Sequence, residues 1–120
     1  MFNFEKLEVW QKSIVFADRI YAATANFPVS ERFGLISQMR RASVSVSANI
    51  AEGSSRSSHP NFVRFVEMAT GSLFEIVSQL TIACHQGFLK EADYRQLCSA
   101  AEELVRMLSG LRKPLRQSAA

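Results

Sequence analysis

The sequence predicts an all-α protein whose fold is an antiparallel up-down-up-down four-helix bundle. Apolar residues recur at steps of three and four in four long segments, which is the period of an amphipathic helix. Short stretches containing proline, glycine or serine separate these segments, and short connections favour antiparallel neighbours. The chain has 120 residues, of which 48% are hydrophobic, so we expect one domain (1–120) with ample apolar material for a core.

The first predicted helix covers residues 7 to about 25, and it has to end before Pro28 because a residue preceding proline disfavours helical geometry. The second is predicted from about 31 to 53. Ser30 is its expected N-cap, and Gly53 begins the glycine–serine stretch that is expected to stop it.

The third predicted helix runs from its N-cap Ser58 to the C-terminal glycine Gly87. Gly71 lies in its middle, where glycine costs about 1 kcal/mol relative to alanine, so we expect another backbone to approach closely there. The fourth helix is predicted over about 90–112, with Pro114 as its stop.

A stripe of polar residues distinguishes the second helix. Six of them follow steps of three and four, which places them on one helical face: Gln38, Arg41, Ser45, Asn49, Glu52 and Arg56. The third helix offers polar and small residues at matching spacing: Arg64, Glu67, Gly71, Ser72 and Glu75. We predict either an interhelical polar network within one chain or a polar face that is buried in an oligomer.

Motifs for catalysis, metal binding or cofactor binding are not found in the sequence. His59 and His85 lack a second ligand at helical spacing, so we expect neither a metal nor a cofactor. Glu52, Glu67 and Glu75 could meet between the second and third helices, and a pair of carboxylates could perform acid–base chemistry. A structural role is favoured because an unpaired buried charge is costly. We therefore predict that the protein is not an enzyme, and we keep an enzyme using the Glu52 and Glu75 region as the third hypothesis.

Hydropathy and cysteine usage point to a cytoplasmic protein. No run of eighteen apolar residues is present, so no membrane span is expected, and the N-terminal residues lack the apolar block of a signal peptide. Cys84 and Cys98 do not form a CxxC motif, and we expect both to be reduced and packed in or near the core.

The positive charge is unevenly distributed along the chain. The net charge is +3, but residues 32–66 contain five arginines and one glutamate, and residues 106–120 contain four basic residues and no acid. Such clusters can mark an anionic partner such as nucleic acid, or they can form a solvated face.

Three stretches of the sequence resemble a known family. They are LEVWQKS (7–13), FPVSERFGLISQMRRASVSVSANIAEGSSR (27–56) and GSLFEIVSQL (71–80). The chain is similar to the four-helix-bundle proteins associated with intervening sequences in bacterial 23S rRNA genes. The resemblance implies a left-handed bundle that assembles into a homopentamer and is linked to nucleic acid. The accessory protein of diversity-generating retroelements, a basic pentamer that binds nucleic acid and a reverse transcriptase, is similar in fold.

The family resemblance extends to particular residues. It falls on Gln38, Arg40, Arg41, Asn49, Glu52, Gly53, Arg56, Gly71, Ser72 and Glu75. The chain departs from the family pattern at Ser47, where the family often has proline, at Asn61, where it often has an acid, and at Val77, which replaces a common glutamate. These departures leave the expected fold unchanged, but they weaken the transfer of any interaction site.

Two function classes follow from these residues. The first is a non-enzymatic homo-oligomer that binds RNA or DNA phosphates without reading bases, and its candidate residues are Arg40, Arg41, Arg56 and Arg64. The alternative is a protein-interaction scaffold that does not bind nucleic acid and uses its arginines in assembly. The candidate residues for the polar network or oligomer interface are Gln38, Ser45, Asn49, Glu52, Gly53, Gly71, Ser72 and Glu75.

Overall fold

A computed structural model describes residues 1–55 and 58–119 of the chain, the last eight of these (112–119) by their backbone only. The described residues form four α-helices: α1 (Glu8–Thr24), α2 (Ser37–Ser54), α3 (His59–His85) and α4 (Glu91–Ala119). A 3₁₀-helix, η1 (Asn3–Lys6), precedes α1. A second 3₁₀-helix, η2 (Val29–Glu31), and a π-helical turn, η3 (Arg32–Ile36), precede α2.

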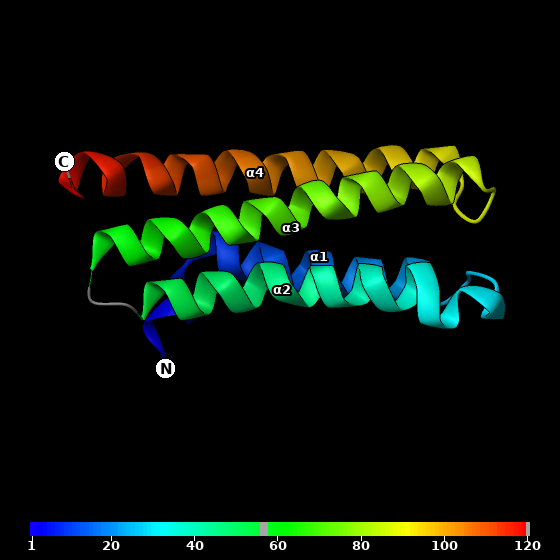
Figure 1. The fold of residues 1–120 in the computed structure, drawn as a ribbon, viewed down its shortest axis with the longest axis horizontal. Coiled ribbons are helices and arrows are strands. Elements are labelled where there is room, and N and C mark those ends of the chain that lie inside the picture. The colour runs from blue at the N-terminus through cyan, green and yellow to red at the C-terminus, as the bar shows by residue number, and fades with distance from the viewer. Residues whose placement is uncertain (56–57, 120) are drawn as a thin grey trace.

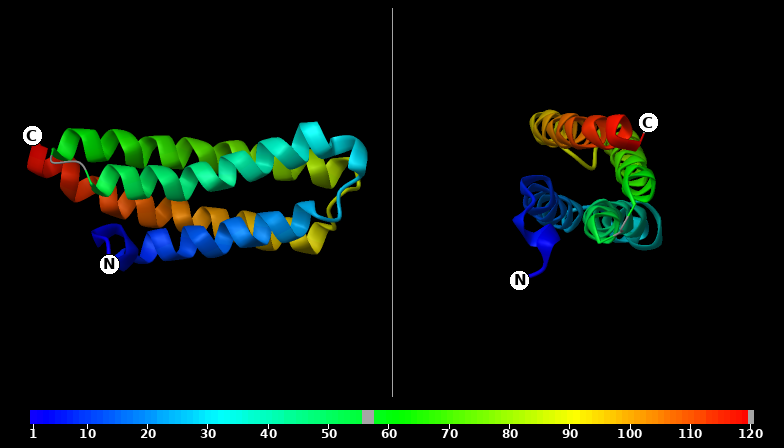
Figure 2. Two further views of the ribbon diagram at one scale, coloured as in Figure 1. Left: turned by 90° about the horizontal axis from the view of Figure 1, so that it is seen from below. Right: turned by 90° about the vertical axis from the view of Figure 1, so that its left-hand side faces the viewer.

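The helices form the predicted antiparallel bundle. Figure 1 shows that each helix runs in the direction opposite to the one before it, with α2 in front of α1 and α4 along the outer side of α3. The end-on view of Figure 2 places the four helices around a common centre in the order α1, α2, α3, α4. The molecule is elongated, with principal extents of 46 × 24 × 20 Å.

Apolar stripes of all four helices meet along this centre. The fully or nearly fully buried members include Phe16 and Ile20 of α1, Met39, Val46 and Ile50 of α2, Leu73, Ile76 and Leu80 of α3, and Leu97, Leu104 and Leu108 of α4. Burying one such side chain stabilises the fold by about 1.5–3 kcal/mol. The predicted helical period therefore identifies the core faces of α2, α3 and α4, whereas in α1 it also runs through Ile14 and Tyr21, which are 37% and 43% exposed.

Both predicted ends of α3 are confirmed. The Ser58 hydroxyl accepts a hydrogen bond from a backbone N–H of the first turn. At the other end Gly87 has φ of +80°, a left-handed conformation that glycine adopts without strain. Its N–H donates to the carbonyl of Cys84, and the N–H of Phe88 donates to the carbonyl of Ala83. These two bonds form a Schellman motif, which turns the chain toward α4.

The prediction that α2 begins at Glu31 is wrong. Regular α-helix begins at Ser37, and Gly34 has non-helical φ and ψ of −107° and −113°. The Glu31 carboxylate accepts a 3.1 Å hydrogen bond from the backbone N–H of Leu35, so a side chain takes the place of a helical acceptor. The resulting η2 and η3 turns hold the expected cap Ser30 away from the start of α2.

Pro114 does not end α4, contrary to the prediction. The backbone remains helical to Ala119. A proline inside a helix removes one backbone donor and clashes locally with the preceding turn, but it leaves the other hydrogen bonds in place. The helical turns on both sides can therefore carry the backbone across it.

The close approach expected at Gly71 occurs at Gly53 instead. A methyl group added at Gly71 would meet no atom within 4 Å, whereas one at Gly53 would lie 2.7 Å from Cβ of Phe65 and 3.1 Å from Cδ1 of Phe62. Gly53 is buried in the last turn of α2, which ends at Ser54. Glycine at this position lets α3 pack closely against the end of α2.

Candidate functional site

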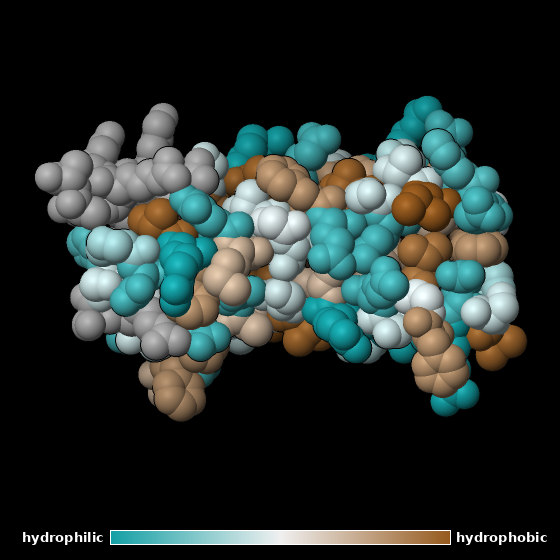
Figure 3. Space-filling model, viewed as in Figure 1, coloured by the Kyte–Doolittle hydropathy of each residue, from teal (hydrophilic) through white to brown (hydrophobic). Residues whose placement is uncertain are grey.

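The polar stripe of α2 lies beside α3 and forms what we call the α2–α3 face. This surface comprises Gln38, Arg41, Ser45, Asn49 and Glu52 of α2 and Arg64, Gly71, Ser72, Glu75 and Gln79 of α3. It is turned toward the viewer in Figures 1 and 3, and hydrophilic and neutral residues dominate its middle.

Hydrogen bonds join the two helices at the centre of the α2–α3 face. The hydroxyl oxygens of Ser45 and Ser72 lie 3.0 Å apart. The Asn49 side-chain amide donates to the Ser45 carbonyl over 2.8 Å and to the Ser45 hydroxyl over 3.0 Å. The structure thus brings three of the predicted network residues together within one chain.

A second polar contact of the α2–α3 face was missed by sequence reasoning. The side-chain amide of Gln79 donates a 3.0 Å hydrogen bond to the carboxylate of Glu75. Gln79 is only 6% exposed, and no described group donates to its Oε1 atom. Its spacing, four residues after Glu75 and seven after Ser72, is the signal that could have found it.

Three other predicted residues of α2 can also be placed. Gln38 and Glu52 are exposed on the same side of the helix, and Gly53 is buried against Phe65. Arg56 lies outside the described residues.

Arg40 is directed away from the α2–α3 face and packs on the end of α1. Its Nε donates a 2.9 Å hydrogen bond to the Thr24 hydroxyl, and its guanidinium also donates to the Tyr21 carbonyl over 3.2 Å. The guanidinium carbon lies 4.6 Å from the centre of the Tyr21 ring. A cation beside the last carbonyls of α1 is favoured by the helix dipole, so this arginine has a structural role.

Arg41 and Arg64 are both exposed on the α2–α3 face. Neither takes part in the ion pairs found among the described residues, although the Arg64 guanidinium lies 5.3 Å from the centre of the Phe65 ring. Ser45 is level with Ser72, and α2 and α3 run in opposite directions, so Arg41 is level with about position 76 of α3. Arg64 therefore lies about twelve residues from Arg41 along the bundle axis, or roughly 18 Å at 1.5 Å per residue.

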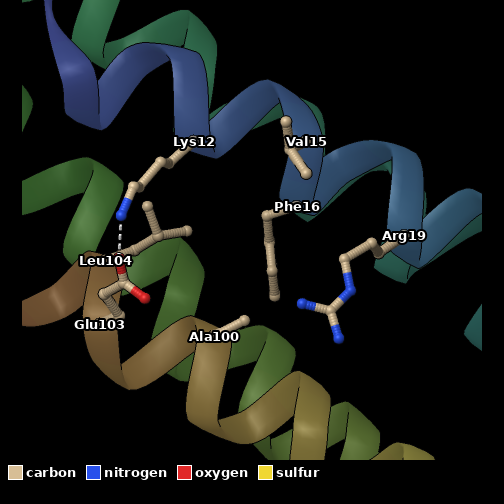
Figure 4. A pocket seen from close by; sticks show the side chains of 7 residues that line it. All are labelled: Lys12, Val15, Phe16, Arg19, Ala100, Glu103 and Leu104. Atoms are coloured by element: carbon tan, nitrogen blue, oxygen red, sulfur yellow. Dashed lines mark hydrogen bonds and ion pairs between the residues drawn. The ribbon is translucent and has the colours of Figure 1, made fainter.

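A small pocket lies between α1 and α4. Its open volume is about 180 Å³, and Figure 4 shows Lys12 and Arg19 of α1 beside Glu103 and Ala100 of α4. Lys12 binds Glu103 and closes one end of the pocket. This volume is below the range of about 300–1,000 Å³ that is typical of small-molecule sites.

The part of the chain that the structure describes contains no cluster of side chains suited to metal or redox chemistry. There, no three His, Cys, Asp or Glu side chains are grouped so that they could hold a metal ion. His59 and His85 are exposed at opposite ends of α3. Cys84 and Cys98 are free and half-buried, and burial raises the pKa of the Cys98 thiol, which disfavours the reactive thiolate.

None of the described helices combines the length and the apolar character needed to cross a bilayer.

Comparison with known proteins agrees with this architecture. Residues 5–110 match the family described as 23S rRNA-intervening sequence protein. The bundle is similar to the crystal structure of a protein of unknown function from the S23 ribosomal protein family of Bacteroides thetaiotaomicron. The TM-score is 0.79 at 24% sequence identity, over 88% of this chain and 98% of that one. At this identity the likeness shows the fold alone. No curated protein matches the chain. The match over residues 5–110 shows that the chain belongs to the 23S rRNA-intervening sequence protein family.

Proposed function

We propose that the protein is a non-enzymatic, cytoplasmic homo-oligomer that binds RNA or DNA through phosphate contacts of its α2–α3 face. The observation that carries this proposal is the exposure of Arg41 and Arg64 on one face, outside the ion pairs of the described residues. Exposed arginines of this kind can contact phosphates in pairs of hydrogen bonds. A homopentamer, the assembly that the family resemblance implies, would repeat this pair in every subunit.

Repetition matters because each pair alone is weak. Two phosphate contacts in one chain give little affinity, but several linked copies bind one polymer with a high effective concentration. Arg40 is omitted from the contact set, since Tyr21 and Thr24 already hold its guanidinium. Among the described residues, the α2–α3 face offers no array of exposed aromatic rings for base stacking, so we expect binding with little sequence preference.

The test is fluorescence anisotropy with a labelled structured RNA and a labelled duplex DNA over a salt series. The wild type should bind more weakly as salt rises, because binding to phosphates releases counterions. For duplex DNA, the Arg41→Ala/Arg64→Ala variant should lower the salt slope by about 0.9 per lost phosphate contact. Arg95→Ala is the matched control, because Arg95 is exposed on α4 and pairs with Glu91 at 2.7 Å.

The absence of wild-type binding at low salt would contradict nucleic-acid binding. A double variant that binds as tightly as the wild type would contradict the assignment of the contacts to Arg41 and Arg64. Light scattering checks that the variant keeps the mass of the wild type.

A scaffold without nucleic-acid binding is the second candidate. It is favoured by Arg40, an arginine of the basic stretch that serves packing within the chain rather than a partner. In this case Arg41 pairs across subunits with a carboxylate such as Glu75, which is exposed on the same face. The scaffold would be supported if Arg41→Ala dissociates the oligomer and the wild type shows no affinity for nucleic acid.

A further inference from the structure

Two strongly exposed apolar residues lie next to the start of α2. Phe33 is 85% exposed and Val29 is 83% exposed, and the non-α turns η2 and η3 hold both at the surface. The Arg32 guanidinium lies 5.2 Å from the centre of the Phe33 ring. We call Val29, Arg32 and Phe33 the Phe33 corner. Hydrophobic side chains stand out from the surface at the end of the molecule where α2 begins (Figures 1 and 3).

An apolar groove lies elsewhere on the same chain, along the seam between α3 and α4. Its lining residues are Phe74, Val77, Ala101, Glu102, Val105 and Arg106, and we call it the Phe74 groove. Phe74 is 61% exposed on its wall. The open volume is about 330 Å³, which corresponds to about ten water molecules at about 30 Å³ each, so an aromatic side chain can enter.

Arg32 of the Phe33 corner and Glu102 of the Phe74 groove carry opposite charges, and Arg106 also lines the groove. Arg32 stands beside Phe33 and belongs to none of the ion pairs of the described residues. Glu102 stands at the rim of the Phe74 groove, and its contact with Arg106 is long, at 3.9 Å, with both side chains about 70% exposed. A cation arriving with an aromatic ring would therefore meet a weakly held carboxylate.

We propose that the Phe33 corner of one copy of the chain docks in the Phe74 groove of the next copy, with Arg32 pairing with Glu102 across the contact. The inference rests on the homo-oligomer proposed above and specifies its contact surfaces. The corner and the groove are different surfaces, so the contact is heterologous: each subunit gives its corner to one neighbour and its groove to the other. Such contacts build closed rings when the rotation between neighbours closes.

A complementation experiment tests this contact by light scattering. Phe33→Glu removes the corner and Phe74→Glu spoils the groove. Both residues are more than half exposed, so each variant should keep the fold, which circular dichroism checks. Each variant alone should be a monomer. An equimolar mixture should give a one-to-one dimer and nothing larger, because only one intact corner and one intact groove can meet.

Val15→Glu is the matched control, since Val15 is 58% exposed on α1, outside both surfaces. It should keep the mass of the wild type. A charge exchange adds a second test: Arg32→Glu and Glu102→Arg should each raise the dissociation constant at least about threefold, and the double variant should recover most of the loss.

The outcomes separate this inference from the proposed oligomer. A wild type that is monomeric at all concentrations would contradict both and leave the groove to a partner other than this chain. An oligomer whose mass is unchanged in Phe33→Glu and Phe74→Glu would overturn the docking contact alone. Variants that dissociate but do not recombine would show that the two surfaces do not meet each other, which also overturns it.

Discussion

Arg40 on α2 donates a hydrogen bond to Thr24 near the end of α1, with 2.9 Å between Nε and the hydroxyl oxygen. Thr24 is fully buried, and its hydroxyl in turn donates to the carbonyl of Ile20 over 2.8 Å. The contact ties the beginning of α2 to the end of α1. Adjacent arginines in the sequence therefore have different surroundings, because Arg41 lies exposed on the α2–α3 face.

Replacing Arg40 should destabilise the fold, and replacing Arg41 should not. Arg40→Ala removes two hydrogen bonds from a charged donor and a contact with the Tyr21 ring, so we expect a loss of about 1–3 kcal/mol in the free energy of unfolding. Arg41→Ala should change it by less than about 0.5 kcal/mol. Urea unfolding followed by circular dichroism measures both, and equal effects would refute the division of roles.

Gly53 and Gly71 should respond to alanine in opposite ways. Gly53→Ala places a methyl group 2.7 Å from Cβ of Phe65, so α2 and α3 have to move apart at a cost of about 1–3 kcal/mol. Gly71→Ala meets nothing within 4 Å, and it should raise the free energy of unfolding by up to about 1 kcal/mol through helix propensity. Thermal unfolding of the two variants compares them directly, and a stabilising Gly53→Ala would contradict the close packing.

The hydrogen bond between Ser45 and Ser72 should appear as coupling between the two helices. Ser72→Ala and Ser45→Ala should each lower the free energy of unfolding by about 0.5–1.5 kcal/mol. The double variant should lose less than the sum, because both single changes remove the same bond. A double-mutant cycle measures this difference.

Ser99→Ala is the control for this cycle, because Ser99 is exposed on α4 and belongs to no hydrogen bond of this group. Strict additivity of Ser45 and Ser72 would show that the bond contributes nothing.

The ion pair between Lys12 and Glu103 should make stability depend on pH in a defined window. The hydrogen bond and charge of Lys12 lower the pKa of Glu103. The stability that Glu103 contributes is therefore present above the pKa of an unfolded-state glutamate, and it is lost as pH falls through the lowered pKa. The hydrogen bond and charge of Glu103 raise the pKa of Lys12. The stability that Lys12 contributes is therefore present below the pKa of an unfolded-state lysine, and it is lost as pH rises through the raised pKa.

The measurement is the difference in Tm between the wild type and Lys12→Met from acid to alkaline pH. The difference should be present at neutral pH, disappear at both extremes and shrink with added salt, because the pair is exposed. Lys6→Met is the control, as Lys6 is exposed and outside the described ion pairs. A difference that persists below the acidic limit would assign the effect of Lys12 to packing of its aliphatic stem.

Much of the bundle could be predicted from local sequence signals. The step of three and four identifies the buried faces of α2, α3 and α4, since side chains at this spacing project to one side whatever packs against them. In α1 the same step also runs through Ile14 and Tyr21, which are exposed, while Phe16 and Ile20 are buried. The Ser58 cap and the Gly87 turn could be predicted for the same reason: their hydrogen bonds join neighbours in the chain. Pattern reasoning failed where a local preference competed with its surroundings, at Glu31 and at Pro114.

The sequence by itself therefore determined the fold class, the core faces of α2, α3 and α4, and the caps of α3, which depend on contacts within a helix or turn. Only the tertiary structure decided which of two adjacent arginines is exposed and which of two helical glycines is packed. Consecutive residues of a helix point about 100° apart, so their surroundings depend on where the neighbouring helix lies. That position is set by long-range packing between α1, α2 and α3, which no local pattern in the sequence records.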